Sequence, residues 1–406
     1  MERKNILVGV TGGIAAYKAA DLVSQLVKQG HDVQVVMTEN ACRFISPVTF
    51  AALTGKAVWL DEFTSSSGMA VPHVQLAGAA DLFVVVPATA NTIAKLAWGL
   101  ADNLLTSIAL VFNKTLLVAP AMNTNMYRHR AVQDNLNILK RRGAHIIEPE
   151  EGRLACGAVG TGKLASVERI LAAIEYHLFA SKTLTGKKVI VTAGGTRENI
   201  DPVRFIGNRS SGKMGFALAK AAMLKGAEVI LVSGPVALQP PVNVRFVQVE
   251  TAAEMRQEVL EHYPEAQVVI MAAAVADYRV ARPFETKIKK REAELELLLT
   301  KNPDILKELG EKKQNQVLVG FAAETEDLIG NARHKLEQKN LDLIVANDVT
   351  RQDAGFHADT NLVTLLFPDG QRQALPLMPK EELAHRILET IESLPRFHKL
   401  DQIDRG

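Results

Sequence analysis

One stretch near the middle of the chain carries side chains that could bind phosphate. Residues 208–213 read N-R-S-S-G-K and open a helical stretch that continues to residue 226. The free N–H groups and the dipole at the start of a helix favour an anion. Each dipole contact contributes only about 0.3–1 kcal/mol at an exposed site, so Arg209 and Lys213 matter as much. We predict anion binding at Ser210, Ser211 and Gly212; the alternative is an ordinary turn with a serine cap.

A second candidate lies at the amino terminus, where an apolar strand runs into Thr11, Gly12 and Gly13. The residues do not match a dinucleotide fingerprint, because the glycine spacing is not G-x-G-x-x-G. Thr38 ends the second strand where a ribose-binding acid is expected, and Glu39 follows one residue later. Hydroxyl and small side chains also follow the next strand, at Pro87, Ala88 and Thr89. They suit a single phosphate and therefore a mononucleotide such as FMN, although Thr and Gly are also common in ordinary loops.

Three further side chains in this half could take part in a reaction. His73 lies just before a short amphipathic helix, and a lone histidine is more often structural than catalytic. Asn123 follows a strand, among methionines, where its amide could hold a carboxylate. Cys156 belongs to the glycine-rich segment RLACGAVGTGKL, which predicts a mobile loop over a site.

Strands alternating with helices must position these residues in the first half. Such alternation predicts right-handed crossovers and a parallel sheet, whose ligands bind beyond the carboxyl ends of the strands. The expected strands cover residues 6–10, 33–37, 82–86 and 116–118, with helices at 14–29 and 167–179.

The second half repeats this pattern and then becomes less regular. Its expected strands cover residues 188–191, 228–232, 244–249, 268–271, 317–325 and 343–346. An extended segment at 287–290 beside a strand at 295–299 interrupts the pattern, and a helix follows from Pro303. A helix at 327–339, a hairpin around residues 368–370 and a final helix at 380–394 complete the chain. We therefore predict an α/β fold with two Rossmann-like or flavodoxin-like domains and mainly parallel sheets.

Length and composition are consistent with this division. A chain of 406 residues predicts two domains of about 200 residues each. We place the first at residues 1–180, a small polar linker at 181–187 and the second at 188–406. The net charge of +2 gives no reason to expect nucleic acid or a membrane surface. Two cysteines exclude a disulfide framework. The sequence shows neither a signal region nor an apolar run of the roughly 20 residues that span a bilayer. These features together predict a cytoplasmic protein.

Five segments in order, GGIAAYK, the isolated His73, PATANTIAK, PAMNTNMY and ACGAVGTGKL, resemble the flavin-dependent cysteine decarboxylases. With its glycine-rich second half, the whole chain resembles the bacterial bifunctional phosphopantothenoylcysteine decarboxylases and phosphopantothenate–cysteine ligases of coenzyme A biosynthesis. The resemblance implies that FMN binds at Gly12, Gly13, Thr38, Pro87, Ala88 and Thr89.

The chemistry of the first half follows from the substrate that the resemblance implies. The carboxylate of an N-acylcysteine has no electron sink, so loss of CO₂ would leave an unstabilised carbanion. Oxidation of the CH₂–SH carbon by FMN gives a thioaldehyde that accepts these electrons, and the resulting enethiol is then reduced. By resemblance, His73 assists the oxidation, Asn123 binds the carboxylate and Cys156 donates the proton in the final reduction.

In the second half, the resemblance implies a ligase that joins 4'-phosphopantothenate to cysteine with CTP and Mg²⁺. Asn208 and Lys287 match the catalytic pair, although lysines at 287–290 could equally belong to a solvated edge strand. A Walker sequence is missing, in agreement with another kind of nucleotide site. The sequence does not indicate the metal ligands. The matched CTP positions are Ala272, Ala273, Ala274, Asp277, Lys287, Asn302, Pro303, Asp304, Ile305, Phe321, Lys335 and Lys339.

The resemblance also implies a homo-oligomer, in which trimers of the first half assemble into a dodecamer while the second half dimerises. Two other functions remain open at this point. The chain could be an NAD-dependent oxidoreductase, against which the missing fingerprint argues, or a flavin-binding regulatory protein, against which His73, Asn123 and Cys156 argue.

Overall fold

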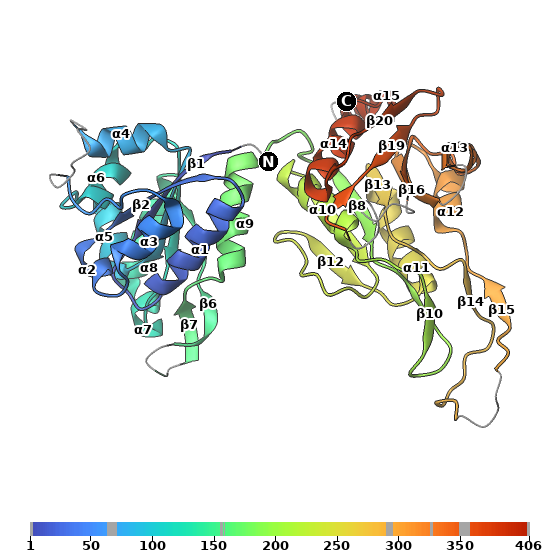
Figure 1. Cartoon of the computed structure of the whole chain (residues 1–406), viewed down its shortest axis with the longest axis horizontal. Helices are drawn as coiled ribbons and strands as arrows, with labels where there is room; N and C mark the ends of the chain where they lie inside the picture. The colour runs from blue at the N-terminus through green and yellow to red at the C-terminus, as the bar shows by residue number, and fades with distance from the viewer. Residues whose placement is uncertain are drawn as a thin grey trace. The chain divides into compact units, whose positions relative to one another are not determined.

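The structure is a computed structural model in which residues 3–62, 71–154, 157, 159–289, 295–324, 328–348 and 358–403 are described. Cys156 and Lys290 lie outside the described residues. The chain forms two compact units, Met1–Phe179 and Ala180–Gly406 (Figure 1). Among the described residues, no helix is long and apolar enough to cross a membrane.

The first unit contains the predicted parallel sheet. Its strands stand in the order β2-β1-β3-β4-β5. They are β1 (Asn5–Val10), β2 (Asp32–Met37), β3 (Leu82–Ala88), β4 (Thr115–Pro120) and β5 (His145–Ile146). The expectation of a parallel sheet is confirmed, because all four pairings between neighbouring strands are parallel.

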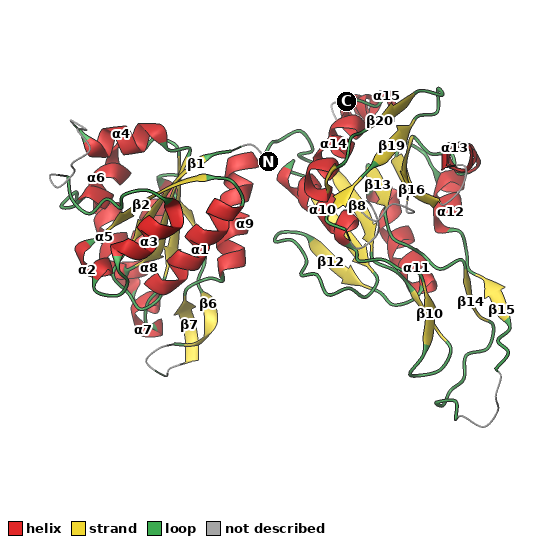
Figure 2. Ribbon diagram, viewed as in Figure 1, coloured by secondary structure: helices red, strands yellow, loops and turns green. Residues whose placement is uncertain are grey.

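Helices cover both faces of this sheet (Figure 2). One apolar core joins the strands to α1 (Ala16–Lys28), α3 (Pro47–Thr54) and α9 (Val167–Phe179). The other core contains residues of α4 (Pro72–Ala79), α5 (Ala90–Trp98), α6 (Leu104–Val111) and α8 (Arg130–Arg141). Because both faces are covered, only the strand ends remain for a ligand. Two short helices, α2 (Glu39–Cys42) and α7 (Thr124–Arg128), follow strand ends.

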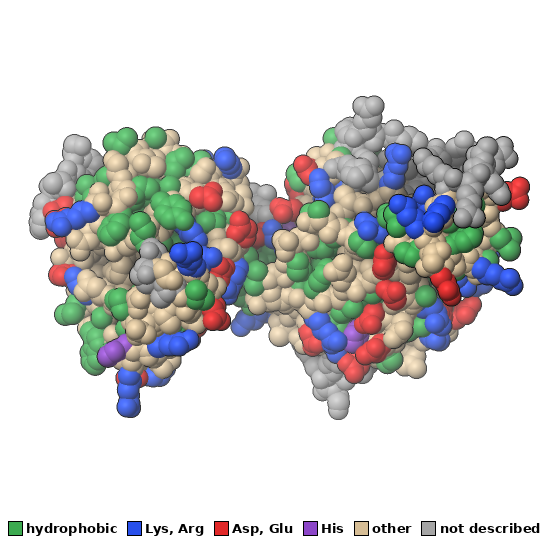
Figure 3. All heavy atoms as spheres, turned by 90° about the horizontal axis from the view of Figure 1, so that it is seen from below, with side chains coloured by type: hydrophobic (Ala, Val, Ile, Leu, Met, Phe, Trp, Pro, Cys, Tyr) green, Lys and Arg blue, Asp and Glu red, His purple; other side chains and the backbone are tan. Residues whose placement is uncertain are grey.

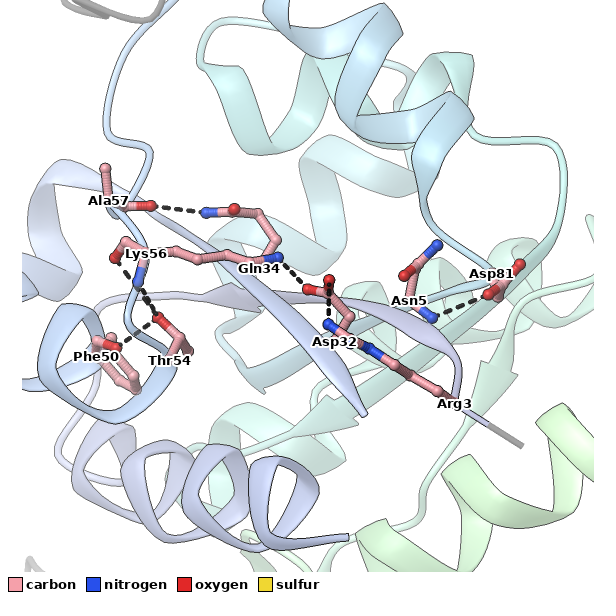
Figure 4. A network of polar contacts seen from close by, with 9 residues as sticks. All are labelled: Arg3, Asn5, Asp32, Gln34, Phe50, Thr54, Lys56, Ala57 and Asp81. Atoms are coloured by element: carbon pink, nitrogen blue, oxygen red, sulfur yellow. Dashed lines mark hydrogen bonds and ion pairs between the residues drawn. The ribbon is translucent and has the colours of Figure 1, made fainter. Parts of the chain in front are cut away.

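A polar network ties the amino ends of these strands together (Figure 4). Asp32, the first residue of β2, pairs with Lys56 and with Arg3, whose guanidinium lies 3.0 Å away. The backbone N–H of Asn5 donates to Asp81 just before β3, at 2.9 Å. The hydrogen bond from Lys56 lowers the pKa of Asp32. The polar groups at the amino ends of the strands are therefore paired with one another, and the candidate site lies at the carboxyl ends.

The second unit is built on an eight-stranded sheet in the order β12-β11-β8-β13-β16-β17-β19-β20. The first six strands are parallel and the last two antiparallel. The parallel strands are β8 (Lys188–Ala193), β11 (Glu228–Ser233), β12 (Arg245–Gln248), β13 (Val268–Met271), β16 (Val317–Glu324) and β17 (Leu343–Asp348). β19 (Val363–Leu366) and β20 (Arg372–Ala374) form the predicted hairpin.

Helices also cover the two faces of this sheet. One core contains residues of α11 (Ala252–His262), α12 (Ile305–Lys312) and α13 (Leu328–Gln338) together with Ile190 of β8. The other face carries α10 (Lys213–Leu224), since a Cβ on Gly215 would lie 2.5 Å from that of Ala193. Ala193 is three residues after Ile190 in the same strand, so its side chain points to the opposite face of the sheet. α14 (Lys380–Glu392) packs against α10 (Figure 1). The chain continues into α15 (Pro395–Ile403).

Two antiparallel ribbons extend from this unit (Figure 2). One pairs β9 (Arg197–Asn199) with β10 (Phe205–Gly207), and the other pairs β14 (Tyr278–Val280) with β15 (Leu299–Lys301). The strand predicted at 295–299 is wrong, because residues 295–298 are irregular and pairing begins only at Leu299. Apolar composition misled the prediction, since Leu295, Leu298 and Leu299 are exposed rather than packed.

The helix predicted to begin at Pro303 begins instead at Ile305. Asp304 is its N-cap, and the carboxylate accepts the backbone N–H of Lys307 at 3.0 Å. A capping aspartate adopts a non-helical backbone, so the helix cannot include Pro303.

Candidate active sites

In the first unit, Thr11 joins the ends of two neighbouring strands. Its hydroxyl donates to the carbonyl oxygen of Pro87 at 2.6 Å and accepts the N–H of Thr89 at 3.1 Å. Thr89 in turn caps α5 by accepting the N–H of Thr92 at 3.3 Å. Thr38 caps α2 by accepting the N–H of Ala41. The predicted hydroxyl groups therefore lie at the carboxyl ends of β1, β2 and β3.

The two glycines of this edge are packed differently. A Cβ on Gly12 would lie 2.5 Å from the Cβ of Asn40. A Cβ on Gly13 would meet only the methyl group of Thr89, at 3.8 Å. Gly12 is therefore needed for close packing of the strand ends, whereas Gly13 exposes backbone that a ligand can approach. Asn40, whose side chain packs against Gly12, was not among the predicted site residues.

His73 lies within a helix, not before one as predicted. Pro72 is the first residue of α4, a position that proline favours, so His73 falls in the first turn. Its Nδ1 lies 3.6 Å from Oε1 of Glu62. This Nδ1 is buried and has no hydrogen-bond partner among the described residues. Glu62, which sequence reasoning did not single out, brings a carboxylate beside the imidazole.

Asn123 caps α7, with its side-chain oxygen accepting the N–H of Asn125 at 2.9 Å. A hairpin of β6 (Glu150–Arg153) and β7 (Val159–Lys163) packs beside it. The carbonyl oxygen of Gly162 accepts the N–H of Met122 at 2.9 Å, and a Cβ on Gly162 would lie 2.4 Å from the carbonyl oxygen of Met122. The hairpin thus holds the Asn123 segment, and Cys156 falls between its strands in sequence, outside the described residues.

The second unit has a cavity of about 610 Å³ at the carboxyl edge of its sheet. It is lined by Asn208 and by every predicted CTP or substrate position except Lys287, namely Ser210, Ser211, Gly212, Ala272, Ala273, Ala274, Asp277, Asn302, Pro303, Asp304, Ile305, Phe321, Lys335 and Lys339. These residues come from five separate segments of sequence, and the fold brings them around one cavity.

Close backbone contacts shape one wall of this cavity. A Cβ on Gly195 would lie 2.6 Å from the carbonyl oxygen of Asn208, so the turn after β8 must approach the 208–213 segment closely. Gly212 caps α10 with a φ of +77°, a conformation that favours glycine. The Asn208 amide donates to the carbonyl oxygen of Val275 at 2.9 Å, which fixes its orientation.

Several charged groups converge on the cavity. Lys339 forms an ion pair with Asp304 at 2.9 Å, and Lys213 forms one with Asp359 at 2.6 Å. Lys380 also lines the cavity and is only 6% exposed. Burial, and secondarily the charge of Lys213, lower the pKa of Lys380. Lys380, Asn347 and Asn361 were missed in the sequence, because no spacing connects them to the other motifs. No group of three potential metal ligands occurs among the described residues.

Lys287 does not line this cavity in its own chain. The N–H of the next residue, Ile288, donates to Asp201 at 3.1 Å, and Arg204 donates to the same carboxylate at 2.6 Å. Burial alone would raise the pKa of Asp201, but these donors and the N–H groups of Val203 and Arg204 lower it to about 2. Asp201 therefore holds the Lys287 segment against the turn between β9 and β10.

Comparison with known proteins identifies both units. Residues 1–178 match the Flavoprotein family, and residues 184–394 match the DNA/pantothenate metabolism flavoprotein C-terminal domain. The coenzyme A biosynthesis bifunctional protein CoaBC of Bacillus subtilis is 50% identical over 98% of both chains. The chain belongs to the family of these bifunctional proteins. The CoaBC of Vibrio vulnificus is 46% identical over 96% of this chain and 98% of its own.

A solved C-terminal domain of a CoaBC protein is 48% identical and covers 52% of this chain and 97% of its own length, with a TM-score of 0.45. Family membership makes this chain a bifunctional enzyme of coenzyme A biosynthesis, with a flavin-dependent decarboxylase unit and a ligase unit that act on pantothenate-derived substrates. The prediction of this family from five short motifs is confirmed. The two other functions considered, an NAD-dependent oxidoreductase and a regulatory protein, are thereby set aside.

Proposed function

We propose that the second unit joins 4'-phosphopantothenate to cysteine with CTP, and that the first unit decarboxylates the product with FMN to give 4'-phosphopantetheine. The observation that carries the ligase proposal is one cavity lined by the predicted CTP and substrate residues of five segments. Two anionic substrates and a small amine must meet there, which requires many fixed cations and polar groups.

In the ligase reaction, the carboxylate of the acid attacks the α-phosphate of CTP, releasing pyrophosphate and forming an acyl-cytidylate. The amine of cysteine then attacks the acyl carbon and releases CMP. Lys335 and Lys339, with Mg²⁺ brought in by the nucleotide, would offset the charge of the phosphates. An amide nitrogen has two hydrogens, so Asn208 can donate to Val275 and still donate to the oxyanion of the second step.

Lys287 would act in the cavity of a second copy. It lies outside the cavity of its own chain, on a segment that Asp201 holds against a neighbouring turn. Exposed apolar side chains surround this region, among them Phe205, Tyr278, Phe284, Leu298 and Leu299. We propose that the second units dimerise through these ribbons, so that each copy supplies Lys287 to the other.

Co-expression of two inactive chains with different tags tests this arrangement. A mixed dimer of Lys287→Gln and Asn208→Asp chains would contain one intact site if Lys287 acts across the interface. Purification through both tags should then restore ligation, whereas each variant alone stays inactive. Absence of activity in the doubly purified dimer would place Lys287 in its own chain's site.

In the first unit, the hydroxyls of Thr38 and Thr89, the backbone of Gly13 and the start of α5 form a neutral, donor-rich edge that fits one phosphate group. FMN bound there would supply the redox chemistry by accepting and returning a hydride. Glu62 near Nδ1 of His73 would keep the proton on that nitrogen and leave Nε2 for the substrate. Asn123 would bind the carboxylate that leaves as CO₂, and Cys156 would donate a proton.

The first unit also carries many exposed apolar side chains. Figure 3 shows hydrophobic side chains gathered on one face of the first unit. Ile14, Tyr17, Phe44, Val48 and Trp98 are all more than half exposed. Such surface favours association, and we propose trimers of first units that dimers of second units connect into a dodecamer. The mass of the intact assembly in solution tests this number.

Two measurements on the purified full chain test the proposed function. The flavin released by denaturation should have the mass of FMN. Release of FAD would contradict the proposal that these strand ends bind a single phosphate group. Pyrophosphate release with phosphopantothenate should require CTP, and equal release with ATP or no release with CTP would contradict the proposed nucleotide.

A further inference from the structure

The lysines that line the ligase cavity come from opposite faces of the sheet. Lys335 and Lys339 belong to α13 or follow it, on the face that α11, α12 and α13 cover. Lys213 and Lys380 are the first residues of α10 and α14, which pack together over the other face (Figure 1). All four residues line the cavity, which therefore has two separate cationic sides.

Lys380 is unusual because a buried ammonium group begins a helix. It is 6% exposed, and its Nζ donates to the carbonyl oxygen of Ala358 at 2.6 Å. A cation at this position meets the positive end of the helix dipole and has lost most of its hydration, both of which are unfavourable. Glu381 in the same turn is engaged elsewhere, with Lys220 at 3.2 Å. The charge of Asp359 offsets part of this cost, and an anion in the cavity would offset more of it.

Asp359 is the carboxylate that now faces this side of the cavity. It lies 2.6 Å from Lys213, its backbone oxygen accepts the N–H of Lys380 at 2.9 Å, and its side chain is 90% exposed. An exposed carboxylate contributes little to stability when it pairs with a lysine. A phosphate dianion entering the cavity could therefore replace it on Lys213 at small cost.

The geometry of the substrates decides which phosphate each side binds. The carboxylate of phosphopantothenate must reach the α-phosphate of CTP, while its own phosphate lies at the far end of the molecule. Asp277 and Asp304 line the cavity, and Asp304 pairs with Lys339. Carboxylates beside lysines suit a triphosphate that arrives with Mg²⁺. The side with Lys213 and Lys380 suits a phosphate monoester that binds without a metal.

We propose that Lys380, together with Lys213, binds the terminal phosphate of phosphopantothenate and selects the phosphorylated acid over pantothenate itself. This assignment rests on the proposed ligase function and adds a residue that the sequence did not indicate. It makes Lys380 a specificity-determining residue, whose contact exists only with the phosphorylated substrate.

Steady-state pyrophosphate release by the full-length Lys380→Met variant tests the assignment. The KM for phosphopantothenate should rise about tenfold or more, the effect of losing one charge-assisted hydrogen bond, while the KM for CTP stays within about twofold. The preference for phosphopantothenate over pantothenate, compared as kcat/KM, should fall by the same factor. A merely structural role would change both acids equally.

Lys220→Gln is the matched control, because Lys220 lies on α10, pairs with Glu381 of α14 and does not line the cavity. It should leave both KM values and the preference unchanged. Lys213→Gln, whose side chain is already 34% exposed, carries the test if Lys380→Met does not fold. Asp359→Asn should strengthen binding of phosphopantothenate, because it removes the competing carboxylate.

Calorimetric titration of the same variants with phosphopantothenate alone, without CTP, separates this inference from the ligase proposal. Weaker binding by Lys380→Met supports the assignment even if no pyrophosphate is released with CTP, a result that would overturn the proposed nucleotide alone. A rise in the KM for CTP with unchanged binding of phosphopantothenate, or an unchanged preference over pantothenate, would overturn the assignment.

Discussion

The two units have their candidate sites at the carboxyl ends of the strands of similar sheets, but different side chains line them. In the first unit the strand ends carry Thr11, Thr38 and Thr89, which hydrogen-bond to backbone groups of the neighbouring turns. In the second unit, lysines line the cavity, two of them as the first residues of helices. The topology therefore decides where a ligand can bind, and the side chains at the strand ends decide which chemistry follows.

The sites also differ in how far apart in sequence their parts lie. The hydroxyl edge of the first unit is assembled from residues 11–13, 38–40 and 87–92, all within its first half. The ligase cavity collects residues from 208 to 380. Substitutions in one unit should consequently affect one activity and leave the other intact, and the following predictions test this separation in order of decreasing effect.

The largest effect should come from the proposed catalytic pair of the ligase unit. Asn208→Asp should slow the second step by about 10²–10³, because a carboxylate repels the developing oxyanion, and acyl-cytidylate should accumulate. Lys287→Gln should release no pyrophosphate, with or without cysteine. Mass spectrometry of quenched reactions distinguishes the two.

Both variants should decarboxylate supplied phosphopantothenoylcysteine at the normal rate. If Asn208→Asp accumulates no intermediate, or Lys287→Gln forms it freely, the two roles are wrongly assigned. Loss of decarboxylation in either variant would contradict the separation of the units.

In the first unit, Cys156→Ser should stop the reaction after CO₂ is lost. A hydroxyl is a much weaker acid than a thiol, so the final protonation fails. The accumulated product should be an enethiol that is lighter than phosphopantetheine by two hydrogens, while ligation proceeds normally. Full conversion to phosphopantetheine would remove Cys156 from the reaction.

A smaller effect on decarboxylation is expected from Gly162→Ala. The new Cβ would lie 2.4 Å from the carbonyl oxygen of Met122, at a φ of +139°, and would push the hairpin away from the Asn123 segment. Gly143→Ala is the matched control, with a φ of +90° and nothing within 4 Å of the new Cβ. Decarboxylation should fall only in the first variant, and equal activity of the two would show that the hairpin does not position Asn123.

The sequence could predict the parallel sheets because the apolar strands and their order along the chain are local features, and the structure confirms both sheets. It could not predict the ribbon at β14 and β15, because the exposed leucines at 295, 298 and 299 have the composition of a buried strand although pairing begins only at Leu299. The same limit applies to the sites. Thr38 and Thr89 stand at predicted strand ends, but Glu62 reaches His73, and Lys380 the ligase cavity, only through tertiary packing.

The smallest effect concerns acid stability of the second unit. Hydrogen bonds from Arg256, and then Lys312, lower the pKa of Glu308 to about 2 from a usual value of 4.5. A depressed folded-state pKa contributes stability above pH 4.5 that is lost as the pH falls towards 2. Because solvent screens this pair, which joins α11 and α12, we expect only a small contribution from it.

Glu308→Gln should therefore lower the stability of the second unit at neutral pH and flatten its loss between pH 4.5 and 2. Both tryptophans of the chain, Trp59 and Trp98, lie in the first unit, so their fluorescence reports that unit separately. The change should appear in far-ultraviolet circular dichroism but not in tryptophan fluorescence. A parallel change in fluorescence would mean that the two units unfold together.

The most direct test of the central claim, two independent reactions in one chain, is a mass balance on the full-length protein. With phosphopantothenate, cysteine, CTP and Mg²⁺, we expect phosphopantetheine together with equal amounts of CMP, pyrophosphate and CO₂. Without CTP no product should form from these substrates, whereas supplied phosphopantothenoylcysteine should still be converted. Phosphopantetheine formed without CTP, or a requirement for CTP when phosphopantothenoylcysteine is supplied, would contradict the account.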